Sequence, residues 1–236
     1  MTTLAKNQAL ARGIGFPRPL VSVDVVIFTV AAGSLEVLLV QRPQTAGEPF
    51  AGLWALPGGF VDVRRDRDLQ SCALRKLNER TGVASPYLEQ LASWGSARRD
   101  PRGWSTTHAY FALIPHQPPS PDARWFPIAG SARTRLAFDH SEILAAAVAR
   151  LRSKVEYTSL PAFLLPKEFT LTELQRAYEA VLGRKLEKSA FRTRVLATEL
   201  VEPAGRMREG PNRPAQLFRI RNPSKPVFFA RTFSPR

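Results

Sequence analysis

The segment from Leu56 to Gly82 constrains the fold of this chain more than any other part of it. A Pro-Gly-Gly turn leads into a stretch that we predict to be a helix from about Asp68 to Arg80, ended by Gly82. With about 100° per residue, its charged side chains Arg75, Lys76, Glu79 and Arg80 share an arc of about 140°. Ala73, Leu74 and Leu77 cluster on the opposite side. The sequence therefore predicts an amphipathic helix with one cationic face.

This segment resembles the signature box of the Nudix family, the hydrolases of nucleoside diphosphates linked to another group. That box reads G-x5-E-x7-R-E-U-x-E-E-x-G-U, where U is aliphatic. The spacing matches from Arg75 to Val83, but two of the box's glutamates are Lys76 and Arg80 here. Gly59 lies 16 positions before Arg75 instead of the box's 14, and the first glutamate position becomes Arg67.

In the Nudix family the box carboxylates hold Mg²⁺ against the substrate diphosphate. Each charge of the wrong sign at ~4 Å costs about 4 kcal/mol at an effective dielectric of ~20, so Lys76 and Arg80 should exclude Mg²⁺. The same cations can neutralise a diphosphate directly. We expect a nucleotide-binding protein with no catalytic residue, no metal and no cofactor. Two alternatives are an ordinary charged surface helix and an active hydrolase in which Asp66, Asp68 and Glu79 rebuild the metal site.

Composition narrows the class of protein. The chain has 236 residues, 44% of them hydrophobic, which is enough for two globular domains, although length alone would also allow one large domain. No stretch of 18 apolar residues occurs, and Met1–Pro19 does not resemble a signal sequence, so we expect a soluble cytoplasmic protein without membrane contact. The single cysteine, Cys72, excludes intrachain disulfides and cysteine-based zinc clusters, and we expect it to be buried.

Hydrophobic periodicity divides the chain into an N-terminal arm (1–17), a ligand-sensing domain (18–155) and a C-terminal domain with a tail (156–236). In the second part we predict strands at 21–30, 35–41, 88–98, 107–114 and around 125–128, and one further helix at 141–155. The fold class is α+β. A mixed sheet sandwiched between helices, α/β/α, fits both this order and the Nudix resemblance.

The C-terminal part has the outline of a winged helix-turn-helix. A proline-containing connection at 160–166 precedes the capping-box pair Thr170 and Glu173, which begins a helix ended by Gly183. A second helix at about 187–199 and two short strands at 200–206 and 216–221 follow. Helix, turn, basic helix and hairpin in this order predict DNA binding.

Charge supports a polyanionic partner for this domain. The net charge is +14, with 19 basic and 12 acidic side chains over residues 1–155 and 15 and 8 over the shorter remainder. The alternatives are a solvated charged face and an RNA-binding platform, although no aromatic pair is interleaved with basic residues there. The residues predicted to contact DNA are Lys188, Ser189, Arg192, Thr193, Arg194, Arg206, Arg208, Asn212 and Arg213.

A second string, from Arg98 to Ser105, resembles the R-D-P-R-G segment of Nudix proteins that act on ADP-ribose. An Asp-Pro-Arg-Gly turn between strands can aim Arg99 or Arg102 at a phosphate and place the Trp104 ring near a base. A charged hairpin turn without a ligand is the alternative. The full predicted ligand set is Arg42, Gly58, Gly59, Arg75, Lys76, Glu79, Arg80, Arg99, Asp100, Arg102 and Trp104.

Over residues 20–221 the chain resembles the NrtR family, the Nudix-related transcriptional regulators of NAD biosynthesis. Leu136-Ala-Phe-Asp-His140 and Arg213-Pro-Ala-Gln-Leu-Phe218 add to the two strings above. The resemblance implies a homodimer whose Nudix domains bind ADP-ribose and whose winged helices bind a palindromic operator. It also implies repression of genes for NAD synthesis or salvage. The wing tip, residues 210–214, is longer than usual in the family. The rival hypothesis is a working ADP-ribose pyrophosphatase with an accessory basic domain.

Overall fold

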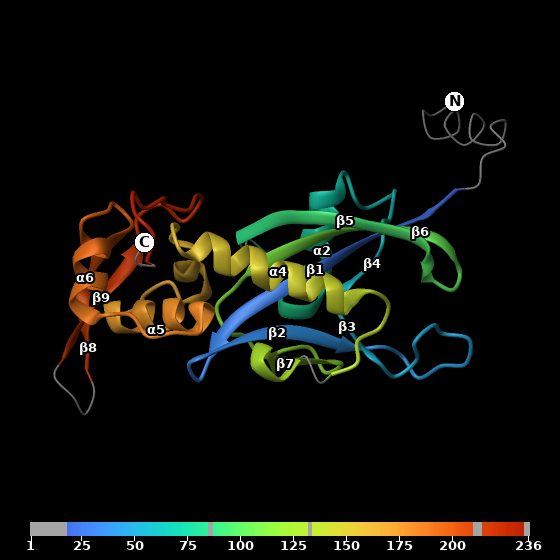
Figure 1. Cartoon of the computed structure of the whole chain (residues 1–236), viewed down its shortest axis with the longest axis horizontal. Coiled ribbons are helices and arrows are strands. Elements are labelled where there is room, and N and C mark those ends of the chain that lie inside the picture. Colours follow the sequence, from blue (N-terminus) through green and yellow to red (C-terminus); the bar gives the residue numbers. More distant parts are fainter. Residues whose placement is uncertain (1–17, 85–86, 132–133, 210–213, 234–236) are drawn as a thin grey trace.

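The computed structural model describes residues 18–84, 87–131, 134–209 and 214–233. The predicted N-terminal arm and two predicted DNA contacts, Asn212 and Arg213, lie outside these ranges. The molecule is elongated, with the sheet-containing part at one end and the orange-to-red winged-helix part at the other (Figure 1). In the described part of the chain, no helix is long and apolar enough to cross a membrane.

A seven-stranded mixed sheet forms the N-terminal part. Its strands are β1 (Leu20–Ala31), β2 (Ser34–Gln41), β3 (Trp54–Ala55), β4 (Gly58–Phe60), β5 (Tyr87–Asp100), β6 (Gly103–Leu113) and β7 (Ala123–Pro127). The order is β3-β2-β1-β6-β5, with β4 paired to β1 and β7 to β2. Strands β1 and β6 run parallel, and the other pairs run antiparallel. The predicted mixed sheet is confirmed.

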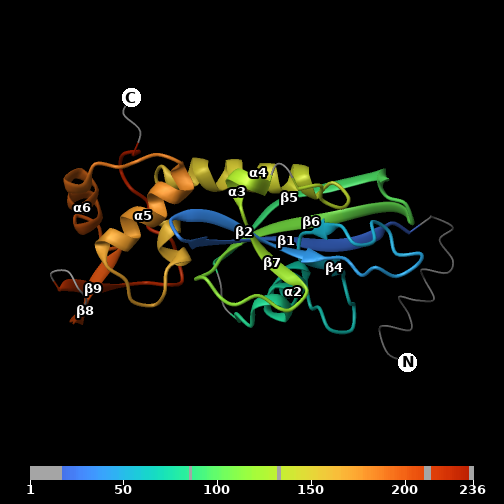
Figure 2. The ribbon, with the colours of Figure 1, turned by 90° about the horizontal axis from the view of Figure 1, so that it is seen from below.

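The central strands are apolar on both faces because helices cover both. Successive β1 residues alternate, so that Val25 belongs to one core cluster and Val26 to the other. Helix α4 (His140–Val155) packs on one face and α2 (Leu69–Thr81) on the other, as Figure 2 shows. A short helix, α3 (Ile128–Ser131), follows β7. The apolar residues Leu144, Val148, Leu151 and Val155 of α4 are all buried.

The C-terminal part contains a 3₁₀ turn (Leu160–Leu164), α5 (Leu171–Leu182), α6 (Lys188–Leu196), β8 (Val201–Arg208) and β9 (Ala215–Ile220). The capping box is confirmed: the Thr170 amide donates to Glu173 Oε2 at 2.8 Å, and the Glu173 amide donates to Thr170 Oγ1 at 3.2 Å. Helix α6 ends at Leu196, three residues before the predicted end at residue 199. Just beyond this end, the Thr198 hydroxyl donates to the Val195 carbonyl. Leu196, the last residue of α6, is 54% exposed.

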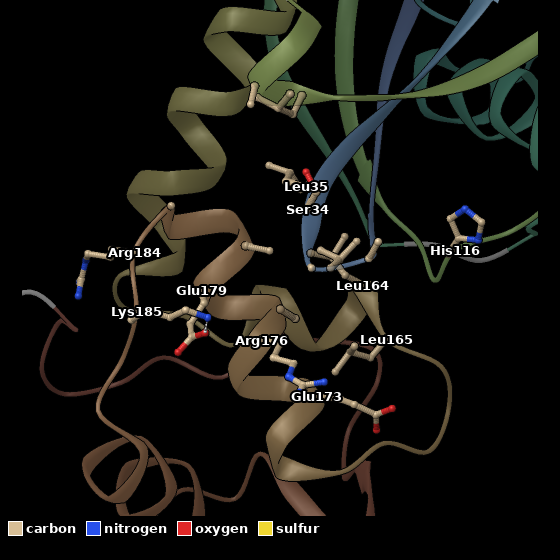
Figure 3. Close-up of a pocket in the computed structure, with 18 of the residues that line it drawn as sticks. Ser34, Leu35, His116, Leu164, Leu165, Glu173, Arg176, Glu179, Arg184 and Lys185 are labelled. Carbon is tan, nitrogen blue, oxygen red and sulfur yellow. Dashed lines mark hydrogen bonds and ion pairs between the residues drawn. The ribbon is translucent and has the colours of Figure 1, made fainter.

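The two parts share one continuous hydrophobic cluster, which runs from the α4 face of the sheet into the winged helix. Arg152 of α4 also donates from Nε to the Val181 carbonyl of α5 at 3.1 Å. At the same junction, a groove of about 940 Å³, lined in part by Arg152, separates the β1–β2 turn from α5. Figure 3 shows Ser34 across from Glu179, whose carboxylate pairs with Lys185 at 2.8 Å. The same hydrophobic core contains residues from both sides of position 155. The domain boundary that we proposed at this position therefore stays a prediction.

Tyr178 offers a direct test of this junction. Its side chain is fully buried, and its hydroxyl donates to the Thr158 carbonyl at 2.9 Å. We expect Tyr178→Phe to lower the free energy of unfolding by about 1–2 kcal/mol, because a buried acceptor loses its donor. Denaturant unfolding measures this loss. Tyr157→Phe is the matched control, since its hydroxyl donates to no described residue. Equal stabilities of the two variants would contradict the assignment.

Candidate ligand cavity and DNA-binding surface

A cavity of about 320 Å³ opens where β1, β4, the end of α2 and the β5–β6 turn meet the start of α4. Its volume is within the range of small-molecule sites. Seven of the eleven residues predicted from sequence line it: Arg42, Gly58, Gly59, Arg80, Arg99, Asp100 and Arg102. Gly58 is required by close approach, because a β-carbon there would lie 2.6 Å from the Val23 carbonyl oxygen.

Arg99 does not point a free guanidinium at a ligand, which differs from the prediction. Its Nη2 donates to Asp24 Oδ2 at 2.7 Å, and its Nε donates to Asp139 Oδ2 at 2.9 Å. The side chain is only 5% exposed. A buried charge needs such partners, and both edges of Arg99 are therefore committed to carboxylates. Arg99 shapes the wall of the cavity.

His140 completes this buried cluster. The Leu56 amide donates to His140 Nδ1 at 2.9 Å, so the ring proton belongs on Nε2, which lies 3.4 Å from Asp24 Oδ2. Burial alone would raise the pKa of Asp24, but His140 and Arg99 lower that pKa below its ordinary value. No role was predicted from the sequence for Asp24, Asp139 or His140, because their partners are 40 to 84 positions away.

Three cations remain at more open positions of the cavity. Arg42 forms an ion pair with Glu48, and Arg80 forms one with Asp122. Arg102 makes a bidentate ion pair with Asp100, with N···O distances of 2.7 and 3.0 Å. The Arg80 and Arg102 side chains are 34% and 39% exposed. Solvent-exposed ion pairs contribute little stability, so an entering polyanion can compete for these guanidinium groups. The arrangement can bind phosphate without a metal.

An aromatic side chain, Phe138, also lines the cavity. Phe138 has a left-handed backbone with φ of 53°, which side chains larger than glycine rarely adopt. Its ring contacts Phe50 at 4.6 Å and lies 4.8 Å from the Arg42 guanidinium. Trp104, predicted to lie near a base, is 51% exposed and covers Gly95 of the neighbouring strand instead of lining the cavity. Phe138 is thus an aromatic residue of the cavity that sequence reasoning missed.

The carboxylates of the box helix are committed to cations. Asp66 accepts from Arg75 Nε at 2.7 Å and from Nη2 at 2.6 Å, and this pairing holds the pKa of Asp66 well below its usual range. Glu79 pairs with Arg75 at 3.1 Å and lies 3.8 Å from Lys76 Nζ. Neither Arg75, Lys76 nor Glu79 lines the cavity. Lys76 is nevertheless beside it, because a β-carbon on Gly59 would lie 3.0 Å from its Nζ.

Mg²⁺ does not fit this arrangement. In the described ranges, no three His, Cys, Asp or Glu side chains converge where they could hold a metal ion. Asp68 is the N-cap of α2 and accepts from the Ser71 amide at 2.7 Å, while Arg67 is 89% exposed. Cys72 is buried as expected, and burial together with the Asp66 carboxylate raises its pKa to about 12.

Helix α6 presents a small set of available polar side chains. Lys188, Ser189, Arg192 and Thr193 are exposed, while Phe191 and Val195 are buried in the core. Within the described part of the chain, Lys188 and Arg192 have no ion-pair partner. The Ser189 and Ala190 amides donate to the Glu187 carboxylate at 2.8 and 2.5 Å, so the helix N-terminus itself is already capped.

The other basic side chains of residues 184–221 are less available than their number suggests. Ion pairs join Arg184 to Glu156, Lys185 to Glu179, Arg206 to Glu168, Arg208 to Glu173, Arg219 to Glu202 and Arg221 to Glu199. Arg194, predicted to read DNA, donates to the Thr232 carbonyl at 2.8 Å and lies 4.3 Å from the Phe233 ring. Its guanidinium is therefore held by the C-terminal tail.

The buried cluster yields a stability prediction. Asp24→Asn leaves Arg99 and His140 without their shared carboxylate, and we expect a loss of about 3 kcal/mol in the free energy of unfolding. Asp122→Asn, which removes the exposed partner of Arg80, should cost less than about 1 kcal/mol.

The acid dependence has a definite sign. Because the folded pKa of Asp24 lies below the ordinary 3.8, its contribution is present above that pH and is lost as pH falls through the folded value. Denaturant unfolding from pH 7 downward should show this acid loss reduced in Asp24→Asn. Equal destabilisation by the two variants at pH 7 would contradict the cluster's role.

Comparison with known proteins identifies the protein family of this chain. A NUDIX domain model matches residues 18–147, and a model of the NrtR DNA-binding winged helix domain matches residues 161–220. The ADPR-responsive transcriptional repressor NtrR of Acinetobacter baylyi is 49% identical over 211 residues, which are 87% of this chain and 83% of that protein.

Two solved structures of Shewanella oneidensis NrtR are also similar. The complex with a 27mer DNA has a TM-score of 0.82 and 40% identity, covering 90% of this chain and 98% of that one. The NUDIX domain in complex with ADP ribose has a TM-score of 0.56 and 43% identity, covering 64% and 99%. The chain belongs to the NrtR family, in which a Nudix domain is joined to a DNA-binding winged helix.

Proposed function

We propose that this chain is an ADP-ribose-responsive transcriptional repressor of genes for NAD synthesis or salvage. The observation that carries the proposal is a cavity lined by four arginines, beside a box helix with lysine and arginine where the Nudix box has glutamates, in one chain with a winged helix whose Lys188 and Arg192 are exposed. The similar A. baylyi repressor and the S. oneidensis complexes with DNA and ADP ribose support the same assignment.

Different residues of the cavity can bind the diphosphate and the adenine base of ADP-ribose. Arg80 and Arg102 are placed to neutralise the diphosphate, with Lys76 beside the Gly59 backbone as a third cation. The Phe138 ring, stacked near Arg42, offers a face for the adenine base. Hydrolysis would need a metal-held water, but Asp66 and Glu79 already bind Arg75. The domain therefore acts as a sensor.

Binding without metal is the first functional prediction. In calorimetry with EDTA, the wild-type chain should bind ADP-ribose, and Arg80→Ala should bind about 10- to 150-fold more weakly because a charged hydrogen bond is lost. Asp122→Asn is the matched control, because it frees Arg80 and should keep or raise the affinity. Rapid Mg²⁺-dependent release of AMP and ribose phosphate, abolished by Glu79→Gln, would establish the hydrolase instead.

For DNA, we propose that α6 enters the major groove with Lys188 and Arg192 towards it, and that the wing follows the phosphates. Arg206 and Arg208 pair with Glu168 and Glu173 at the surface, so phosphates can compete for them. One nine-residue helix reads only a short half-site. A palindromic operator read by a homodimer, with its helices about 34 Å apart, gives the needed affinity.

Arg192 tests this docking mode. Arg192→Ala should weaken binding to a duplex selected from a random-sequence pool by about 5- to 150-fold, if it contacts a guanine edge. Arg98→Ala, an exposed arginine of the Nudix domain, removes the same charge and should leave affinity within about twofold. Fluorescence anisotropy at fixed salt measures both. Equal affinities of the two variants would rule out α6 as the reading element.

Regulation follows from coupling between the two sites. ADP-ribose in the cavity shifts the winged helices of the dimer and so weakens operator binding. Linkage requires that the operator weakens ADP-ribose binding by the same factor, for which about 1–3 kcal/mol is typical. Titrating ADP-ribose into the free protein and into its operator complex gives the factor in both directions.

A further inference from the structure

We propose that Phe233, in the C-terminal tail of residues 227–233, positions the recognition helix α6 for DNA reading. The tail lies outside the matched winged helix domain, which ends at residue 220. In Figure 1 the red segment runs between α6 and the yellow end of α4. This inference rests on the proposed function, since it assumes that α6 contacts DNA.

One side of the tail is bonded to the interdomain linker, residues 156–159. The Ser159 amide donates to the Val227 carbonyl at 2.9 Å, and the Val227 amide donates to Ser159 Oγ at 2.8 Å. The Phe229 amide donates to the Tyr157 carbonyl at 2.8 Å, and the Phe233 amide donates to the Glu156 carbonyl at 3.0 Å. The tail therefore follows the linker as an added strand-like segment.

The other side of the tail contacts both helices of the winged domain. The Phe233 ring lies 5.0 Å from the Tyr178 ring of α5 and 5.9 Å from the Phe191 ring of α6. Arg194 of α6 lies over Phe233 and donates to the Thr232 carbonyl. A cation over an aromatic face and an amide acceptor beside it fix the direction of this guanidinium.

Helix α6 needs such a contact because its own burial is slight. Of its nine residues, only Phe191 and Val195 are buried. Two contacts on one stripe leave the helix free to rock about its axis, and a third contact through Arg194 restricts this motion. Since base edges are read by side chains with fixed geometry, a rocking helix loses sequence-specific contacts before it loses contacts to phosphates.

This assignment separates Arg194 from Arg192, two positions along the same helix. Arg192 is exposed and reaches outward, whereas Arg194 is held by the tail and acts on DNA through the placement of α6. It also gives the linker a direct connection to the reading helix. Movement of residues 156–159 is transmitted to Phe233 through backbone hydrogen bonds.

The first test compares two phenylalanines of the same tail. Phe233→Ala should weaken binding to the selected duplex by about 3- to 30-fold, the range expected for losing a cation–aromatic contact. Binding to a scrambled duplex should be unchanged. Phe228→Ala, whose ring is 66% exposed, should bind both duplexes like the wild type. Phe233→Tyr should restore specific binding because the ring face remains.

A double variant decides how Arg194 acts. If Arg194 works through Phe233, then Arg194→Ala, Phe233→Ala and the double variant should show the same loss of specific affinity. Additive losses would mean that Arg194 touches DNA itself and would overturn the proposal. ADP-ribose affinity in calorimetry should be the same for all variants, and thermal unfolding shows whether the winged helix is intact. Phe233→Leu, which keeps apolar packing but lacks the ring face, replaces Phe233→Ala if that variant unfolds.

The outcomes also separate this proposal from the proposed function. A wild-type chain that enriches no duplex sequence from the random pool refutes DNA reading altogether. A wild type that reads its selected duplex, together with a Phe233→Ala variant that reads it equally well, refutes only the role of the tail.

Discussion

The burial of Arg99 between Asp24 and Asp139 is the interaction on which the cavity depends. It joins strand β1, the end of β5 and the residue that precedes α4, and His140 extends it to the Leu56 amide just before the Pro-Gly-Gly turn. Replacing one partner of a buried pair leaves the other charge without compensation, which costs several kcal/mol. The cluster therefore fixes this wall of the cavity, whereas the ion pairs at its open side can exchange partners.

In the proposed function, the box helix belongs to a hydrolase scaffold that binds a ligand without hydrolysing it. Three carboxylates lie in or beside the box, but Asp66 and Glu79 bind Arg75, and Asp68 caps the helix. Arg75 binds both carboxylate oxygens of Asp66, so a metal ion would have to displace a bidentate ion pair. Lys76 and Arg80 supply positive charge directly, without a divalent ion that must be held by several acids.

Most of the fold could be predicted from local sequence patterns. The role of a side chain could not be predicted where its partner is distant in the sequence. The capping box at Thr170 and the alternating strand β1 depend on neighbours within a few positions, and both were predictable. Arg99 was predicted as a phosphate ligand because the Asp-Pro-Arg-Gly turn is visible in the sequence, whereas Asp24, 75 positions away, is not. The contact of Arg194, predicted to bind DNA, with the Thr232 carbonyl was not visible for the same reason, because Thr232 lies 38 positions further on.

The same distance effect changes how the net charge of the winged helix is interpreted. Basic side chains paired to acids still attract DNA from afar, but they reach phosphates only by exchanging partners. Specific reading then depends on a few unpaired side chains and on the orientation of the helix that carries them. Helix α4 begins at the cavity with His140 and ends at Val155, next to the linker to which the tail is bonded. Its 16 residues span about 24 Å as one rigid element. In the proposed mechanism, a displacement of its first turn by a ligand would be carried to residues 156–159, from there to Phe233, and so to α6.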